Sequence, residues 1–145
     1  MTQISATLEK GMAVTLSNGR HEWIADEPSD AGGTDTGPNP YELLLGSVAA
    51  CTCITLAWYC QHKKLPLKSV SASYALKRIH AKDCADCDIP DKGYIERVTS
   101  DVRIEGDFSE AQQKRLAQIV ERCPVHKTLA NGMQFEDNAS FVTST

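Results

Sequence analysis

The sequence lacks a surplus of positive charge, and it lacks a hydrophobic leader. Its 145 residues include 15 Lys and Arg against 19 Asp and Glu, which gives a formal net charge of -4. Because a nucleic-acid interface needs clustered cations to neutralise phosphates, this balance argues against a nucleic-acid partner. The first ten residues are polar, so we expect no signal peptide and a cytoplasmic protein.

The composition also lacks the signs of disorder or low complexity. Hydrophobic residues make up 41% of the chain and charged residues 23%, which is typical of a soluble globular protein. A chain of this length is expected to bury about 70% of its extended surface in one compact unit. We therefore expect a single domain over residues 1–145.

Cysteine is the residue type that stands out. The chain has six, at positions 51, 53, 60, 84, 87 and 123. A secreted disulfide scaffold would be shorter and denser in cysteine, whereas cytoplasmic thiols are kept reduced. An even number of cysteines in that setting indicates metal binding or redox chemistry more readily than structural disulfides.

The N-terminal part of the chain reads as a strand meander. Apolar and polar residues alternate over residues 3–8, 12–16 and 21–26, which predicts three strands. Between the last two, the Asn18-Gly19 pair tolerates positive φ at both central positions of a hairpin turn. Residues 27–39 are rich in Gly, Pro and Asp, which predicts a loop.

A long helix follows this loop. Asn39 is a good N-cap, Pro40 suits the first helical position, and Glu42 completes a capping box, so the helix begins here and continues to about Lys64, before Pro66. Residues 43–59 carry no charge, so the helix is apolar on all faces and must be buried. A membrane span is disfavoured because the stretch contains Gly, Ser, Thr and Cys and falls short of about twenty strongly apolar residues.

The second half of the chain combines a hairpin with two helices. Alternating patterns over residues 70–76 and 98–104 predict a long β-hairpin with its connection at 81–93. Ser109 and Gln112 form a second capping box, which predicts a second helix. Pro124 can begin a short third helix that reaches Ala130, and a last strand is expected at residues 133–136 or 141–142. The fold class is therefore α+β.

Helical phase separates the thiols of the long helix. At about 100° per residue, Cys53 and Cys60 lie on the side opposite Cys51, so any partner of Cys51 is distant in sequence. Cys53 and Cys60 are interpreted as core residues. Cys123 precedes a helix start, where the dipole favours a thiolate, and His126 could add positive charge. The alternative is that Cys123 is a buried apolar residue of the second helix.

Three segments resemble the OsmC/Ohr family of osmotically inducible and organic hydroperoxide resistance proteins. They are residues 37–46 (GPNPYELLLG), 49–52 (AACT) and 123–129 (CPVHKTL). The resemblance also extends to the order of meander, loop, apolar helix, hairpin and second Cys-bearing helix. It implies an α+β fold with a long buried central helix, built as an intertwined homodimer with two active sites at the subunit interface.

The same resemblance implies a function. Cys51 matches the peroxidatic cysteine of the family and Cys123 the resolving one. The chain would then be a thiol-dependent peroxidase that reduces alkyl or lipid hydroperoxides in oxidative stress defence. A Cys51 sulfenic acid would condense with Cys123 to a disulfide, and an external dithiol such as a lipoyl group would reduce it. No bound cofactor and no membrane partner are expected.

The chain departs from the family pattern at one position. Peroxidases of the family carry Glu immediately after the proline, where it helps to hold an activating Arg, and this position is Tyr41 here. Glu42 lies one residue later, so it is interpreted mainly as a capping carboxylate and secondarily as a catalytic candidate. Arg20 is the candidate for the activating Arg, and an exposed hairpin charge is the alternative.

A second group of ligand-type residues lies in the hairpin connection. His80, Cys84 and Cys87 form the pattern H-x3-C-x2-C, and Asp83, Asp86 or Asp88 could supply a fourth zinc ligand. A redox pair of Cys84 with Cys87 and two unpaired loop thiols remain open as alternatives.

Two other functions compete with the peroxidase. One is a thiol–disulfide oxidoreductase that uses residues 123–126 at a helix start. The other is a protein that keeps the OsmC fold, binds a small molecule or zinc, and has little peroxidase activity.

Overall fold

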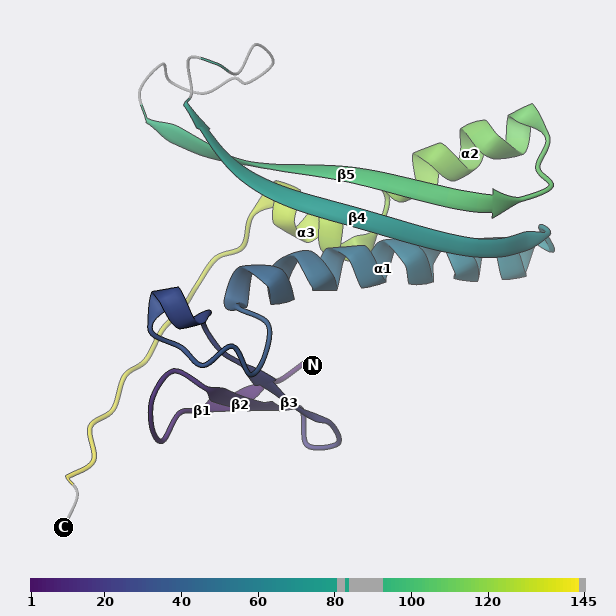
Figure 1. Ribbon diagram of the computed structural model, residues 1–145. Coiled ribbons are helices and arrows are strands. Elements are labelled where there is room, and N and C mark those ends of the chain that lie inside the picture. The colour runs from purple at the N-terminus through teal and green to yellow at the C-terminus, as the bar shows by residue number, and fades with distance from the viewer. Residues whose placement is uncertain (81–82, 84–92, 144–145) are drawn as a thin grey trace.

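The structure is a computed structural model that describes residues 1–80, 83 and 93–143 (Figure 1). The elements follow one another along the chain as β1 (Ser5–Thr7), β2 (Val14–Ser17), β3 (Glu22–Ala25), η1 (Ser29–Ala31), α1 (Pro40–Lys63), β4 (Leu67–His80), β5 (Tyr94–Gly106), α2 (Glu110–Val120) and α3 (Pro124–Asn131). The predicted α+β class and the predicted order of elements as far as α3 are confirmed.

The N-terminal strands form an antiparallel sheet in the order β1-β2-β3. Ser17 pairs with Glu22 at the end of the β2–β3 hairpin, so the connection has four residues rather than two. Within it, Asn18 Oδ1 accepts hydrogen bonds from the backbone N–H groups of Arg20 (3.0 Å) and His21 (2.8 Å). Only Gly19 takes a positive φ there, because the Asn18 side chain stabilises the turn by hydrogen bonds instead of by a left-handed backbone.

The loop after β3 is organised by the buried carboxylate of Asp26. Its Oδ2 accepts from the hydroxyls of Thr34 (2.7 Å) and Thr36 (2.8 Å) and from their backbone N–H groups, and its Oδ1 accepts from the N–H of Glu27. A Cβ at Gly33 or Gly37 would collide with the backbone carbonyl of Glu27 or Ile24. The carboxylate and the two glycines therefore fix the path of the chain into α1.

The helix α1 begins as predicted, with a complete capping box. Glu42 N–H donates to Asn39 Oδ1 (2.9 Å), and Asn39 N–H donates to Glu42 Oε2 (2.8 Å). The helix ends at Lys64, which has a left-handed backbone (φ +52°). Its fully buried residues are Val48, Thr52, Leu56 and Cys60, one turn apart from each other.

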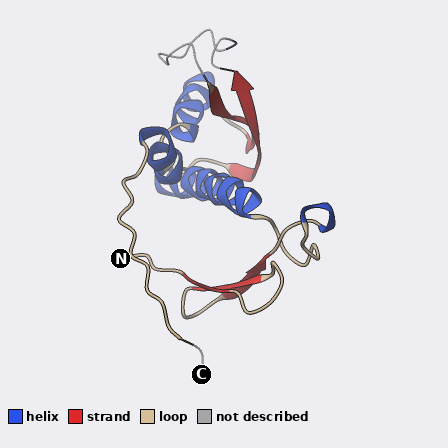
Figure 2. Ribbon diagram, turned by 90° about the vertical axis from the view of Figure 1, so that its left-hand side faces the viewer, coloured by secondary structure: helices blue, strands red, loops and turns tan. Residues whose placement is uncertain are grey.

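The single chain buries this stripe of α1 and leaves much of the helix exposed, with Ile54 67% and Trp58 58% accessible. The expected burial on all faces is thus met on one side only, where the β4–β5 hairpin, α2 and α3 cover the helix (Figures 1 and 2). The three-stranded sheet lies on the other side of α1 in both views. By length and composition α1 could cross a membrane, but one side of it packs against β4, α2 and α3.

The core is a small cluster between α1 and α2, formed by Leu56, Cys60, Leu116 and Ile119. It lies under the hairpin, whose Val70, Val102 and Ile104 are partly buried against it. The sequence predicts that both Cys53 and Cys60 lie in the core. Cys60 does so, but the prediction for Cys53 is wrong, because this side chain is only half-buried on a part of α1 that the chain leaves uncovered.

The chain closes differently from the prediction after α3. Gly132 follows the helix with a φ of +77°, but residues 133–143 form no strand. The predicted strand at 133–136 or 141–142 is wrong, because a strand needs a sheet edge to pair with and this segment pairs with neither sheet. Phe135 and Phe141 remain 79% and 97% exposed.

We predict that Asp26 makes the protein acid-sensitive. Hydrogen bonds from Thr34 are the largest influence on its pKa, and together with those from Thr36 and Glu27 they outweigh desolvation and hold the pKa well below the usual range. A depressed pKa in the folded state stabilises the protein above the unfolded-state pKa of about 3.9, and this contribution is lost as the pH falls below it. Asp26→Asn should therefore be less stable than the wild type at pH 7 and lose less stability on acidification.

Urea unfolding at pH 7 and pH 3 tests this prediction, with Asp30→Asn on the exposed η1 helix as the matched control. The control should follow the wild type at both pH values. Equal acid-induced losses of unfolding free energy in Asp26→Asn and the wild type would contradict the assignment.

Candidate thiol site

The structure brings two thiols together at the junction of α1 and α3. Cys51 lies in the middle of α1, and Cys123 is the N-cap residue of α3 with Pro124 at the first helical position. The Cys123 Sγ is fully buried and lies 4.0 Å from the carbonyl oxygen of Val48, one turn before Thr52. Cys51 is half-buried, and its Sγ lies 3.9 Å from Thr55 Oγ1. Both thiols are free.

The two thiols differ in acidity. Burial, followed by the hydrogen bond to Cys123, raises the pKa of Cys51. Burial would also raise the pKa of Cys123, but the hydrogen bonds from Cys51, from the backbone N–H of His126, from the Thr52 side chain and from the N–H of Val125 lower it below the ordinary value. Since two thiolates in contact repel each other, ionisation of one thiol disfavours ionisation of the other, and the hydrogen bonds favour Cys123 as the one that ionises first.

A cavity of about 260 Å³ is lined by Val48 of α1, by residues of β4 and β5, and by His126, Leu129 and Ala130 of α3. Its apolar walls come from Val48, Val98 and Leu129, and its polar groups from Tyr74, Glu96 and His126. Val48 belongs both to the cavity wall and, through its carbonyl oxygen, to the surroundings of the Cys123 thiol. The cavity therefore adjoins the turn of α1 next to the Cys123 sulfur, and its walls suit an apolar molecule.

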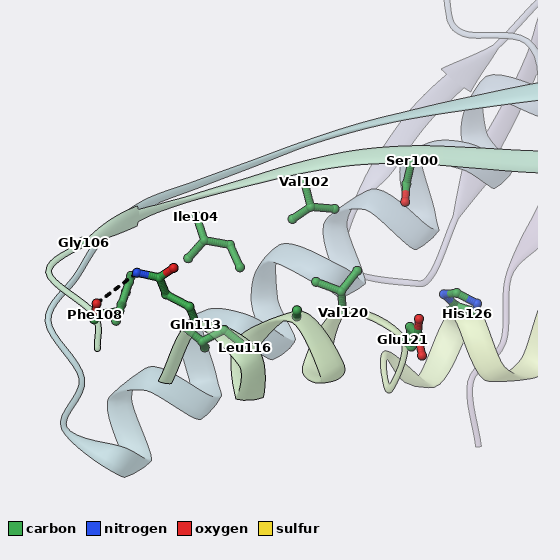
Figure 3. A pocket seen from close by; sticks show the side chains of 11 residues that line it. Ser100, Val102, Ile104, Gly106, Phe108, Gln113, Leu116, Val120, Glu121 and His126 are labelled. Atoms are coloured by element: carbon green, nitrogen blue, oxygen red, sulfur yellow. Dashed lines mark hydrogen bonds between the residues drawn. The ribbon is translucent and has the colours of Figure 1, made fainter. Parts of the chain in front are cut away.

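A larger cavity of about 640 Å³ lies between β5 and α2 (Figure 3). Ser100, Val102 and Ile104 of β5 face Val120 of α2 across it, and His126 lies at one end. Ser100 and His126 line both cavities. The larger one reaches away from the thiols along α2, so the smaller one is the better candidate for the reacting molecule.

The other two predicted site residues lie elsewhere in the chain. Glu42 is in the capping box at the start of α1, so the capping interpretation is confirmed. Arg20 is exposed in the β2–β3 hairpin, on the opposite side of α1 from the β4–β5 hairpin (Figure 1). Neither is among the main groups that shift the pKa of Cys51 or Cys123. Tyr41, at the position where the family has Glu, is 58% exposed.

The proposed second ligand cluster stays a prediction. The His80 ring contacts the Tyr94 ring edge to face, with centroids 5.3 Å apart. Cys84 and Cys87 lie outside the described residues. Within residues 1–80, 83 and 93–143, no group of three metal-ligating side chains is found.

Sequence reasoning missed two residues that the structure places at the site. Thr52 is fully buried and its Oγ1 lies 2.8 Å from the Tyr74 hydroxyl of β4. The sequence could have indicated Thr52, because a buried hydroxyl in an apolar helix needs a hydrogen-bond partner and this one follows Cys51 directly. It could not have indicated Tyr74, because the alternation along β4 only assigns this residue to one face of the hairpin.

Comparison with known proteins gives one consistent result. The sequence profile described as OsmC-like protein matches residues 33–137. Among solved structures, an OsmC-like protein of Mycoplasma pneumoniae is 22% identical (90% of this chain, 87% of that chain, TM-score 0.70). A protein of Psychrobacter arcticus described by osmotic stress induction and detoxification response is 20% identical (88% and 87%, TM-score 0.67). An organic hydroperoxide resistance protein of Legionella pneumophila is 21% identical (88% and 87%, TM-score 0.60). No curated protein matches the chain.

We predict that Glu42 acts through the helix start. Glu42→Gln keeps an acceptor for the Asn39 N–H, so its unfolding free energy should stay within about 0.5 kcal/mol of the wild type. Asn39→Ala, which removes the cap itself, should lose roughly 1 kcal/mol. Urea denaturation measures both. If Glu42→Gln kept its stability but its thiols were oxidised by hydroperoxide more than tenfold more slowly, the carboxylate would have a chemical role instead.

Proposed function

The chain belongs to the OsmC-like protein family, and on that premise we propose that it is a thiol-dependent peroxidase that reduces organic hydroperoxides through Cys51 and Cys123. The observation that carries the proposal is the closeness of these two free thiols, one half-buried and one fully buried, at the α1–α3 junction. The hydroperoxide resistance described for the Legionella pneumophila neighbour adds support from the same fold.

The lowered pKa of Cys123 next to Cys51 suggests how the first step proceeds. Cys51 passes its proton along its hydrogen bond to the Cys123 thiolate, and the resulting Cys51 thiolate attacks the terminal oxygen of the hydroperoxide. The O–O bond breaks, Cys51 becomes a sulfenic acid, and the alkoxide leaves. The alkoxide takes the proton from Cys123 and departs as an alcohol, so Cys123 acts as the local proton carrier.

The second step uses the Cys123 thiolate that the first step regenerates. It attacks the sulfur of the Cys51 sulfenic acid, hydroxide leaves and is protonated to water, and a Cys51–Cys123 disulfide forms. An external dithiol, such as a lipoyl group, then reduces this disulfide by thiol–disulfide exchange and becomes a disulfide itself. The cycle needs no bound cofactor, and we place it in the cytoplasm.

The smaller cavity supports an organic rather than an inorganic peroxide as substrate. Val48, Val98 and Leu129 offer apolar walls to an alkyl chain, and burial of such a chain gains about 25 cal/mol per Å² of apolar surface. Tyr74 and His126 on the same cavity could hydrogen-bond the polar peroxide end. Hydrogen peroxide would gain only the second of these interactions.

We also propose that the active protein is a homodimer in which Arg20 reaches the site of the other subunit. The support is the unpartnered apolar surface of the single chain. Ile54 and Trp58 on α1 and Met12 and Ile24 on the N-terminal sheet are all exposed. A second copy could cover both surfaces at once. It would also pack against the N-terminal hairpin and bring Arg20 close to the thiol pair of the other subunit.

The two thiols give the first functional prediction. Cys51→Ser should lose hydroperoxide turnover by at least a hundredfold, because a serine hydroxyl is a far weaker nucleophile than a thiolate. Cys123→Ser should be oxidised once and then stall as a sulfenic acid. Cumene hydroperoxide consumption with a dithiol reductant, together with dimedone trapping of the sulfenic acid, measures both effects.

Cys53→Ser is the control for that experiment, because this half-buried thiol lies on the opposite side of α1. It should keep wild-type turnover. Full activity in both Cys51→Ser and Cys123→Ser would refute the peroxidase. Protein disulfide reduction without peroxide would favour the oxidoreductase alternative, and stoichiometric zinc with little turnover would favour the binding protein.

The dimer gives a second functional prediction. If Arg20 acts across the interface, a heterodimer of Arg20→Ala with Cys51→Ser subunits contains one complete site. Random mixing of the two inactive variants should then restore about a quarter of the wild-type activity per subunit. Turnover after mixing and refolding measures this. No recovery in mixtures shown by sedimentation to be dimeric would mean that Arg20 does not act across the interface.

A further inference from the structure

The larger cavity has an apolar part and a polar end (Figure 3). In the apolar part, Val102 and Ile104 of β5 face Val120 of α2, and Phe108 lies at the far end. All four side chains also pack against the core cluster. The Gln113 side chain, which lines the same part, donates a hydrogen bond to the Phe108 carbonyl (3.0 Å). This part of the cavity therefore offers hydrophobic walls to an apolar ligand.

The polar end is where the larger cavity meets the smaller one. Ser100 and His126 line both cavities, and Glu121 lies at the same end of the larger one in Figure 3. Beyond this junction the smaller cavity becomes apolar again at Val98, as far as Glu96 at its end. Polar side chains in the middle thus separate two apolar arms.

The two arms follow β5 in opposite directions. From Glu96 to Gly106, every second residue of β5 lines one cavity or the other, so these residues share one face of the strand. At about 3.3 Å per residue, one arm extends about 13 Å from Ser100 to Glu96, and the other extends about 20 Å from Ser100 to Gly106. A groove of this length fits an extended acyl chain, and its middle fits a polar group partway along that chain.

The thiol site lies at the level of this junction. Ser100 pairs with Tyr74 across the hairpin, and the Tyr74 hydroxyl lies 2.8 Å from Oγ1 of Thr52, the residue that follows Cys51 in α1. On the other side, His126 lies in the first turn of α3, next to the N-cap cysteine. Both neighbouring helices therefore place their thiol-bearing segments beside the middle of the groove rather than at either end.

We propose that the two cavities form one groove that binds the acyl chain of a lipid hydroperoxide, with the peroxide group at the junction and the chain in both arms. The proposal rests on the proposed function and deepens it, because it selects hydroperoxides whose peroxide group lies in the interior of a chain. Ala117 of α2 and Ala130 of α3 line one arm each, and their small side chains leave room for the chain. Both are thus specificity-determining residues.

Turnover of a long and a compact substrate tests the groove. Ala117→Phe and Ala130→Phe each fill one arm, and both alanines are exposed, so neither change disturbs the core. Each variant should lower kcat/KM for linoleic acid hydroperoxide by about tenfold or more, because the long chain needs both arms. Ala117→Phe should keep kcat/KM for cumene hydroperoxide within about twofold of the wild type, because this compact substrate fits the smaller arm.

Ala111→Phe is the matched control. It makes the same change at another exposed alanine of α2, one that does not line the cavity. It should leave kcat/KM for both substrates unchanged. If Ala117→Phe turned over linoleic acid hydroperoxide as fast as the wild type, the larger cavity would not belong to the site. A loss in Ala130→Phe alone would confine the chain to the smaller cavity and would also overturn the proposal.

Binding without turnover separates the groove from the peroxidase. Cis-parinaric acid, a fluorescent polyunsaturated fatty acid without a peroxide group, should bind the reduced protein. Ala117→Phe should weaken this binding by about tenfold, and Ala111→Phe should not change it. Absence of binding to the wild type would overturn the groove even if cumene hydroperoxide is reduced. Binding that Ala117→Phe weakens, in a protein without hydroperoxide turnover, would uphold the groove and reject the peroxidase.

Discussion

The packing of the start of α3 against the middle of α1 is the contact on which the proposed chemistry depends. It places Cys123 on the turn of α1 that contains Val48 and Thr52 and thereby next to Cys51. Each helix alone has only one of the two thiols. Pro124 fixes where α3 begins, and Val48 is the residue of the buried α1 stripe whose carbonyl oxygen lies next to the Cys123 sulfur. A change in either would separate the sulfurs without altering any reacting group.

Much of this arrangement could be predicted from the sequence because it is encoded locally. The capping boxes at Asn39 and Ser109, the proline before α3 and the alternation of β4 and β5 each specify an element by short-range interactions. Helical phase correctly assigned Cys60 to the core. The pairing of Cys51 with Cys123 came from the family resemblance rather than from spacing, and the structure brings the two thiols into contact.

The features that sequence reasoning missed depend on contacts between distant segments. The alternating pattern of residues 21–26 places Asp26 at the end of a strand. Its structural role, however, depends on the hydrogen bonds that it accepts from the Thr34 and Thr36 hydroxyls in the following loop. The relation of Thr52 to Tyr74 depends on the angle at which the hairpin crosses α1. The predicted C-terminal strand failed for the same reason, since an extended pattern does not reveal whether a sheet edge is available. Burial of α1 was overestimated because one chain covers only one of its sides.

Tyr41 stands where peroxidases of the family carry Glu, and the surroundings of the two thiols bear on what this difference changes. A peroxidase that relies on a nearby cation to ionise its attacking thiol would suffer from the loss of the carboxylate that holds this cation. Here the groups that lower the pKa of Cys123 include Cys51 and the backbone N–H groups of Val125 and His126 at the start of α3. These groups belong to the α1–α3 junction itself and do not depend on a carboxylate at position 41. If the proposed peroxidase chemistry is right, ionisation of Cys123 would give Cys51 an acceptor for its proton, so that either sulfur could carry the charge of the pair.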